Sequence, residues 1–338
     1  VVVKDKAIKT PDGKMPSVAC IAGPTASGKS ALALALARAL CAQGQAAAIV
    51  NADASQIYGD IPILSAAPDP AEQAELPHHL FGHVGASGGM SAAQWAAEAR
   101  AVIERCAARG VVAILVGGTG LYIRTLFDGI SDMPPIDPAV RAAVRALPVD
   151  VAYGALQMAD AAGAAALHPH DSARIARALE VVRATGRPIG AWRAQKAGGI
   201  GGEVELAATI LLPPREWLRA RIATRVEAMW QDGAVAEVAA LLARDVPPSA
   251  GVMRAIGVPQ IAAFLSGEYD AAGAKAAMIA ATQQYAKRQY TWFRNQSPDD
   301  WARLDAPLND DEIARNVIKL QSNTKVSPGN TLCLNFTL

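Results

Sequence analysis

Large side chains and long apolar runs are scarce in this chain of 338 residues. Aromatic residues make up 5% of it, although 51% of it is hydrophobic. Much of that fraction is alanine, which favours helices over a core built from large side chains. No run reaches the ~18 consecutive apolar residues that a membrane-spanning helix needs, and no apolar secretion signal begins the sequence. We therefore expect a cytoplasmic protein without a membrane partner.

An excess of basic charge is also lacking. The sequence has 32 Lys and Arg against 31 Asp and Glu, a formal net charge of +1. Proteins that bind nucleic acids usually carry a basic excess, because their side chains neutralise phosphates. The total therefore argues against such a partner, although a neutral total can contain a basic cleft.

Cysteine is the third scarce residue type. The four cysteines are Cys20, Cys41, Cys106 and Cys333, with no CxxC pair and no histidine at metal-ligand spacing. This pattern gives no indication of a zinc site or a disulfide framework. It favours buried thiols in a reducing compartment.

Strands and helices alternate in the first part of the chain. The length of the whole chain predicts two domains, or one α/β domain with a large insertion. Apolar runs at 18–22, 47–51 and 111–116 predict strands, and helical periodicity follows at 31–41 and near 91–109. Such alternation predicts a parallel sheet flanked by helices.

The strand pattern fades after Phe127 and mostly helical sequence follows. Apolar residues spaced as on one helix face predict an amphipathic helix at 171–185. A later strand at 205–212 returns to the sheet, and helices are expected at 216–243 and 271–293. The domains expected are the first part of an α/β core, a helical insertion, the rest of the core with C-terminal helices, and a flexible tail: 15–130, 131–200, 201–323 and 324–338.

A phosphate-binding loop lies between the first strand and the first helix. It fits G-x-x-x-x-G-K-[ST], and its backbone amides and helix N-terminus suit phosphate oxygens. Lys29 adds a full positive charge and Ser30 can reach a Mg²⁺ ion. ATP and other nucleotides are common ligands of such loops, but any diphosphate meets the same geometry. The eight residues are Gly23, Pro24, Thr25, Ala26, Ser27, Gly28, Lys29 and Ser30.

The acidic residue that an NTPase needs at a neighbouring strand end is missing. The third strand ends in Gly117-Gly118-Thr119-Gly120, so no carboxylate there can hold Mg²⁺ or orient water. The nearest candidate is Asp53, which follows the second strand. It can act as a general base toward an acceptor, cap a helix or bind Mg²⁺.

Six sequence blocks, in matching order and spacing, resemble the bacterial tRNA dimethylallyltransferases. The resemblance implies a P-loop NTPase-like fold with a helical insertion that grips the tRNA anticodon stem-loop. It also implies transfer of a dimethylallyl group from dimethylallyl diphosphate to the exocyclic amine of the adenosine beside the anticodon, by a monomer that needs no protein partner. The blocks are Gly23–Ser30, Asp53–Tyr58, Pro77–Leu80, Gly117–Tyr122, His168–Asp171 with Arg174 and Arg177, and Tyr285–Arg294.

The resemblance also implies roles for individual residues in the reaction. Asp53 corresponds to the catalytic base, and Thr25 to a contact with the diphosphate, although it can equally be an ordinary loop hydroxyl. Lys29 and a Mg²⁺ ion on Ser30 would neutralise the leaving diphosphate. Arg225 corresponds to an arginine near the diphosphate, with Arg221 an equally placed neighbour.

The resemblance also implies that a larger set of residues contacts tRNA. An amide such as Gln56 suits a base edge, and basic residues between aromatics suit backbone contact with stacking. Without the resemblance, Thr119 is a turn residue, the insertion arginines are a solvated helix face, and the aromatics Tyr290 and Phe293 face the core. The set is Asp53, Ala54, Ser55, Gln56, Thr119, Arg141, Ala173, Arg174, Ile175, Ala176, Arg177, Arg254, Lys287, Arg288 and Arg294.

Three positions depart from the family pattern. Ala54 replaces a serine, Ala67 replaces a basic residue, and Gln283 replaces an arginine; each removes a polar contact to tRNA. Three other functions stay open: a small-molecule or nucleotide kinase, an adenylate prenyltransferase, and a nucleotide-driven RNA-binding switch. The basic insertion helix and the 287–294 segment argue against the second, because it acts on free nucleotides.

Overall fold

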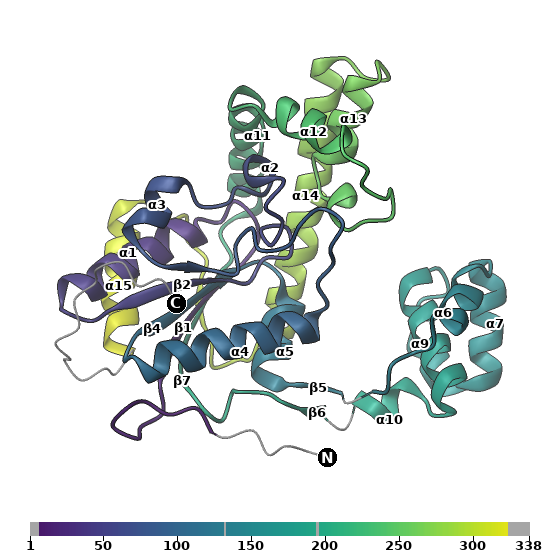
Figure 1. Ribbon diagram of the computed structural model, residues 1–338, viewed down its shortest axis with the longest axis horizontal. Coiled ribbons are helices and arrows are strands. Elements are labelled where there is room, and N and C mark those ends of the chain that lie inside the picture. The colour runs from purple at the N-terminus through teal and green to yellow at the C-terminus, as the bar shows by residue number, and fades with distance from the viewer. Residues whose placement is uncertain (1–6, 132, 194–195, 324–338) are drawn as a thin grey trace. The chain divides into compact units, whose positions relative to one another are not determined.

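The computed structural model describes residues 7–131, 133–193 and 196–323 (Figure 1). The chain divides into two compact units. One joins Val1–Leu126 to Gly201–Leu338, and the other is Phe127–Ile200.

The first unit is built on a six-stranded parallel sheet of order β3-β2-β4-β1-β7-β8. The expected strands are confirmed, and two short edge strands, β3 and β8, were missed because two or three residues show no periodicity. Ala22 pairs with Gly117, and Asn51 with Val116, so β1, β2 and β4 end at one edge of the sheet. The bounds are β1 Ser17–Ala22, β2 Ala47–Asn51, β3 His78–His79, β4 Val112–Gly117, β7 Glu205–Leu211 and β8 Ala302–Leu304.

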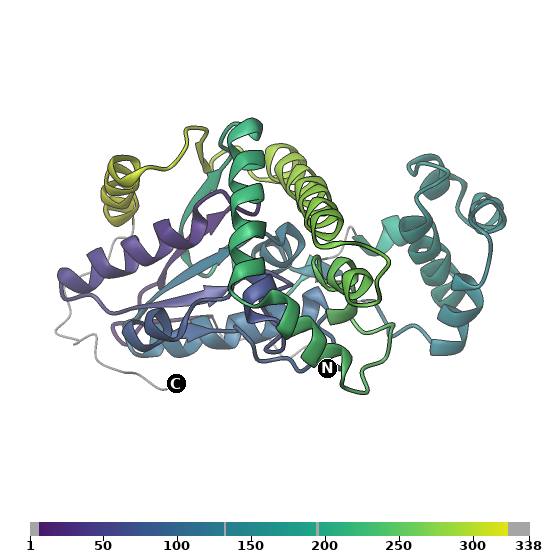
Figure 2. The same ribbon diagram turned by 90° about the horizontal axis from the view of Figure 1, so that it is seen from above.

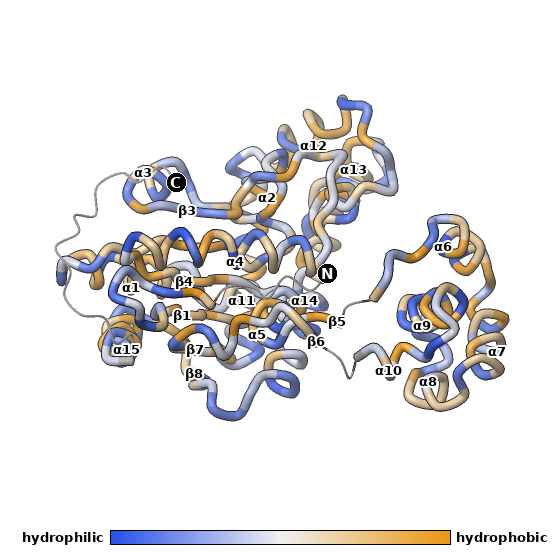
Figure 3. Tube along the Cα trace, turned by 60° about the horizontal axis from the view of Figure 1, so that its bottom comes forward, coloured by the Kyte–Doolittle hydropathy of each residue, from blue (hydrophilic) through white to orange (hydrophobic). Residues whose placement is uncertain are grey.

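Helices cover both faces of this sheet (Figure 2). On one face, α1 (Lys29–Ala42) and α15 (Asp310–Asn323) share an apolar core with the strands. On the other lies α4 (Ala92–Ala108), which starts at a capping box formed by Ser91 and Gln94. Apolar and polar residues alternate along α4 (Figure 3), as expected for a helix with one buried face.

A helical layer stands at the carboxyl ends of the strands. The single helix expected at 216–243 is wrong: it is broken at Gly233, whose φ of +106° no helix residue adopts. The helix expected at 271–293 is confirmed and continues to Gln296. The helices at this end are α2 Pro62–Ser65, α11 Arg215–Gln231, α12 Ala234–Leu242, η1 Val252–Arg254, α13 Val258–Leu265 and α14 Ala271–Gln296. Of the other helices, α3 Pro70–Glu75 precedes β3 and α5 Gly120–Asp128 follows β4.

The second unit is mostly helical and has its own apolar core. The helix expected at 171–185 is confirmed as α9, which Asp171 caps at its start and Gly186, at φ +66°, ends. Two short strands pair antiparallel at the base of this unit. Its elements are β5 Ile130–Ser131, α6 Pro138–Arg145, α7 Val149–Ala159, α8 Ala161–Ala165, α9 Ser172–Thr185, α10 Ile189–Arg193 and β6 Lys196–Ala197.

The cysteines follow the sequence expectation in part. Cys20 and Cys106 are buried and free, and burial raises the pKa of the Cys20 thiol to about 12 and that of Cys106 to about 11. Cys41 is disulfide-bonded, so the expectation of a thiol is wrong there. Cys333 and the tail at 324–338 lie outside the described residues.

In the described ranges, none of the helices combines the length and apolar character needed to cross a bilayer.

Candidate active site

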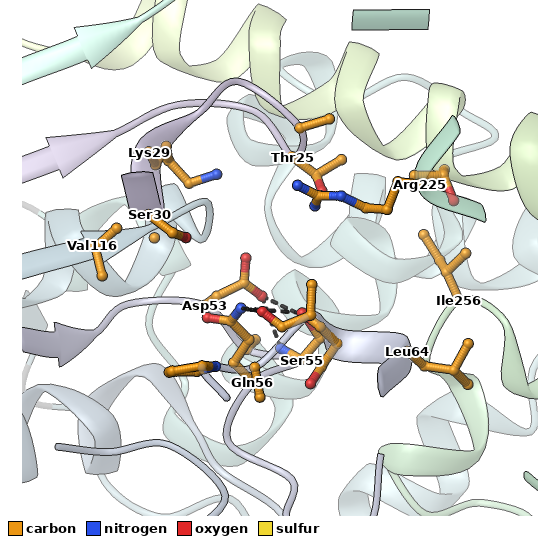
Figure 4. Close-up of a pocket in the computed structure, with 18 of the residues that line it drawn as sticks. Thr25, Lys29, Ser30, Asp53, Ser55, Gln56, Leu64, Val116, Arg225 and Ile256 are labelled. Atoms are coloured by element: carbon orange, nitrogen blue, oxygen red, sulfur yellow. Dashed lines mark hydrogen bonds between the residues drawn. The ribbon is translucent and has the colours of Figure 1, made fainter. Parts of the chain in front are cut away.

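A cavity of about 640 Å³ lies at the carboxyl ends of β1 and β2. Figure 4 shows Lys29, Arg225 and the Asp53 carboxylate pointing into one common space. The cavity therefore unites the phosphate loop, the segment after β2 and side chains of α11 and α14. The expected site residues on its wall are Thr25, Ala26, Ser27, Gly28, Lys29, Ser30, Asp53, Ala54, Ser55, Gln56, Arg225, Arg254 and Arg288.

The glycines at the two ends of the phosphate loop have conformations that other residues rarely adopt. Gly23 has φ +151° and Gly28 has φ +93°. A Cβ at Gly23 would lie 2.5 Å from the Leu211 carbonyl oxygen, so β7 packs directly against the loop. Gly28 immediately precedes α1, and the loop thus delivers the positive end of that helix to the cavity.

Lys29 is buried beneath this loop, with 9% of its surface exposed. Its ammonium donates a hydrogen bond to the Pro24 carbonyl oxygen at 2.9 Å. Burial lowers the pKa of Lys29 from 10.5 to about 8; Asp53 opposes that shift and Arg225 adds to it. A cation so poorly solvated gains much from an anionic ligand.

Two arginines of α11 reach the phosphate loop at different atoms. Arg225 Nη1 donates to the Thr25 hydroxyl at 3.4 Å, and burial lowers the pKa of this guanidinium. Arg221 Nε donates to the Ala26 carbonyl oxygen at 3.0 Å and its guanidinium stacks on Trp217. Arg225 thus contacts the loop's side chain, whereas Arg221 braces the loop's backbone.

The Asp53 carboxylate is fixed by a local turn. Asp53 Oδ1 accepts hydrogen bonds from the Ser55 amide at 3.0 Å and the Ser55 hydroxyl at 2.7 Å. The Asp53 amide in turn donates to Asn51 Oδ1 at 2.8 Å. This is a turn and not a helix cap, and Oδ2 is left to face the cavity (Figure 4).

Gln56 is held by the last turn of α2. Its Nε2 donates to the carbonyl oxygens of Ser65 and Ala66, at 3.1 and 2.7 Å. These bonds occupy the donor group of the amide, so its oxygen is the atom presented to a ligand as an acceptor.

Thr119 lies behind the cavity wall. Its hydroxyl accepts a hydrogen bond from the Ala54 amide at 2.9 Å, and its own amide donates to the Ala52 carbonyl oxygen at 3.1 Å. The preceding Gly117 has no room for a Cβ, which would lie 2.1 Å from the Ala52 backbone. The segment after β4 is thus fastened to the segment that carries Asp53.

The basic residues of α14 separate on its faces. Arg288 reaches the cavity wall, whereas Lys287 and Arg294 are exposed outside it. The aromatics face inward, as the alternative interpretation expected: Phe293 is fully buried, and the Tyr290 hydroxyl donates to the Leu212 carbonyl oxygen at 3.2 Å. One helix therefore combines a packed face with a basic one.

In the second unit, arginines of α6 and α9 surround one buried carboxylate. Glu180 is 1% exposed, and its oxygens lie 2.8 Å from Arg145 Nε, 3.5 Å from Arg177 Nη1 and 4.0 Å from Arg141 Nε. The side chains of these three arginines stay between 41% and 63% exposed. The three arginines therefore form a basic surface above the buried Glu180 carboxylate.

The other residues expected in the second unit differ in exposure. Arg174 is exposed and pairs with Asp171 at 3.4 Å. Ala173 is exposed and Ala176 partly buried. Ile175 is fully buried in the core of the unit, so its side chain is not available to a partner.

Sequence reasoning did not identify Gln289, Arg145 and Glu180. Gln289 lies within the 285–294 block but looked like one polar residue among many on a helix. The charge pattern of α6 and α9 gave the arginines as exposed side chains, and only the fold reveals that they share Glu180.

Known proteins share much of this sequence. A family model described as IPP transferase matches residues 56–296. The chain is 57% identical over 304 residues to a tRNA dimethylallyltransferase of Sphingopyxis alaskensis, covering 90% of this chain and 98% of that one. For its counterpart in Erythrobacter litoralis, the identity is 52% over 299 residues, with 88% and 94% covered.

Two solved structures share the fold. A eukaryotic dimethylallyltransferase acting on tRNA aligns with a TM-score of 0.78 at 27% identity, over 95% of this chain and 86% of that one. A tRNA isopentenylpyrophosphate transferase of Bacillus halodurans aligns with a TM-score of 0.65 at 27% identity, over 91% and 96%. The P-loop α/β fold expected from the sequence is confirmed, and the chain belongs to the tRNA dimethylallyltransferase family of prenyltransferases.

Proposed function

We propose that this site transfers a dimethylallyl group from dimethylallyl diphosphate to the exocyclic amine of the adenosine next to a tRNA anticodon, and releases diphosphate. The observation that carries the proposal is the opposition of Lys29 and Arg225 to Asp53 across one cavity (Figure 4). The cations suit a leaving diphosphate and the carboxylate suits an amine nucleophile.

The phosphate loop serves the leaving group. The start of α1, the Lys29 ammonium and the Arg225 guanidinium all present positive charge to the same part of the cavity. As the allylic C–O bond breaks, its electron pair leaves with the diphosphate, and these groups stabilise the growing negative charge. Group transfer needs no water, so a carboxylate that orients water after β4 is unnecessary.

Mg²⁺ fits this site as a companion of the diphosphate. Ser30 brings a hydroxyl to the cavity, and oxygen atoms are the ligands that Mg²⁺ prefers. Among the described residues, no cluster of three or more His, Cys, Asp or Glu is arranged to hold a metal. Diphosphate oxygens and water would therefore complete the ligand set. The ion would neutralise charge on the leaving group.

Asp53 serves the acceptor. Its Oδ1 is fixed by Ser55, and Oδ2 is free to orient the amine and take its proton as the new C–N bond forms. An aromatic amine is a poor nucleophile, so this help has a large effect on the rate. Gln56 presents an amide oxygen to the same cavity, which suits a base edge rich in donors.

Labelled prenyl transfer is the direct test. Purified protein, Mg²⁺, labelled dimethylallyl diphosphate and an anticodon stem-loop with consecutive adenosines should yield labelled RNA and diphosphate. Label appearing only on free AMP would favour an adenylate prenyltransferase. ATP turnover on another acceptor, without any label in RNA, would favour a kinase.

The arginines around Glu180 are expected to bind the tRNA backbone. We expect Arg177→Ala to weaken stem-loop binding and to reduce the slope of log K against log salt by about 1, because one phosphate contact is lost. Binding titrations at several salt concentrations measure both effects, and the affinity for dimethylallyl diphosphate should stay the same.

Arg183→Ala is the matched control for this experiment. Arg183 is exposed on the same helix, and its substitution removes the same charge. It is not one of the arginines that pair with Glu180. Equal salt slopes for the two variants would show that Arg177 is an ordinary solvated side chain that makes no specific phosphate contact.

A further inference from the structure

One buried amide connects the phosphate loop to the segment after β4. Gln289 lies on α14 and is 5% exposed. Its Oε1 accepts a hydrogen bond from the Thr25 amide at 2.8 Å, and its Nε2 donates to the Gly118 carbonyl oxygen at 2.8 Å. The amide oxygen of Gln289 is therefore bonded to the phosphate loop, and its amide nitrogen to the segment after β4.

The segment after β4 has no side chain where this amide lies. A Cβ at Gly118 would come within 2.2 Å of Gln289 Nε2 and 3.2 Å of Asp53 Oδ2. Gly118 therefore lets both the Gln289 amide and the Asp53 carboxylate approach the same stretch of backbone.

The contacts continue from Gly118 to the segment that carries Asp53. The next residue, Thr119, accepts a hydrogen bond from the Ala54 amide through its hydroxyl. The path thus runs from the Thr25 amide through Gln289, Gly118 and Thr119 to the neighbour of Asp53. On the phosphate side, Thr25 also receives Arg225 at its hydroxyl.

We propose that Gln289 is a positioning residue that holds the phosphate loop and the segment of Asp53 at a fixed separation. This inference rests on the proposed function, in which the two loops hold the two reacting partners. Group transfer is sensitive to the approach of the nucleophile, and a displacement of about 1 Å can cost ~10²-fold in rate. Gln289 contributes to the rate through both loops without itself touching the substrate.

Gln289→Glu tests the proposal with little change in shape. An ionised glutamate can still accept from Thr25, but its second oxygen faces the Gly118 carbonyl oxygen and has no proton to donate. Because burial favours the protonated form, which can donate, kcat is compared with wild type up to about pH 9. We expect kcat for prenyl transfer to fall ~30-fold or more, with the KM for tRNA within about twofold of wild type, since the tRNA-binding surfaces are unchanged.

Gln284→Glu is the matched control, because it makes the same change at an exposed position of the same helix. It should keep the wild-type kcat. A double-mutant cycle between Gln289→Met and Thr119→Val supplies a second readout. If both residues act through the 117–120 segment, their effects on kcat will be less than additive. This cycle also serves if the glutamate variant fails to fold.

The outcomes separate this inference from the function on which it rests. Wild-type protein that transfers no label would overturn the proposed function, and with it the positioning role of Gln289. If the wild type transfers label and Gln289→Glu keeps an unchanged kcat, only the positioning role of Gln289 is overturned. Strictly additive effects in the cycle would do the same, because they would make Gln289 a satisfied core residue.

Discussion

Replacing Asp53 with asparagine is expected to lower the rate of prenyl transfer by about 10²–10⁴-fold, the usual contribution of a general base. The amide oxygen can still accept the hydrogen bonds from Ser55, so the turn should keep its shape. Asparagine cannot take the proton of the amine. Single-turnover transfer and stem-loop binding, measured on the same preparation, separate the chemical step from affinity.

The control for this variant is Asp69→Asn. Asp69 caps α3 through the Glu72 amide, and asparagine caps a helix equally well, so neither rate nor folding should change. If Asp53→Asn instead lost its affinity for tRNA and kept its rate once saturated, Asp53 would be a binding residue. Loss of Mg²⁺ dependence would make it a metal ligand.

The parts of the site that follow strand ends could be predicted from the sequence. Parallel strands end at one edge, so Gly23–Ser30, Asp53 and the 117–120 segment had to be neighbours once the strands were recognised. The motif predicted Lys29 as a phosphate contact, and the order of the blocks predicted the family.

Contacts between distant segments could not be predicted. Gln289 meets Thr25 across 264 positions, and nothing in the α14 pattern distinguishes its buried amide from the exposed one at Gln284. Glu180 lay on a helix whose arginines looked like an ordinary solvated face. The helix break at Gly233 was missed because the apolar spacing continues on both sides of it.

The second large effect is expected at Lys29. Lys29→Gln should weaken the binding of dimethylallyl diphosphate by roughly 100-fold, because it removes a charge-assisted contact inside a poorly solvated site. Folding is not expected to suffer. The lowered pKa means that the buried ammonium costs stability below about pH 8, and this cost disappears only as pH rises toward 10.5. A neutral side chain avoids it.

The same pKa predicts how binding depends on pH. Free Lys29 loses its proton above a pKa of about 8, whereas a diphosphate beside it favours the charged form. At about pH 9 the protein should therefore take up nearly one proton with each diphosphate bound, and at about pH 6.5 Lys29 should take up none. Calorimetry in two buffers of different ionisation enthalpy measures this uptake. Lys29→Arg stays charged throughout and should abolish it; equal heats in both buffers for the wild type at about pH 9 would show that Lys29 is already charged before the ligand arrives.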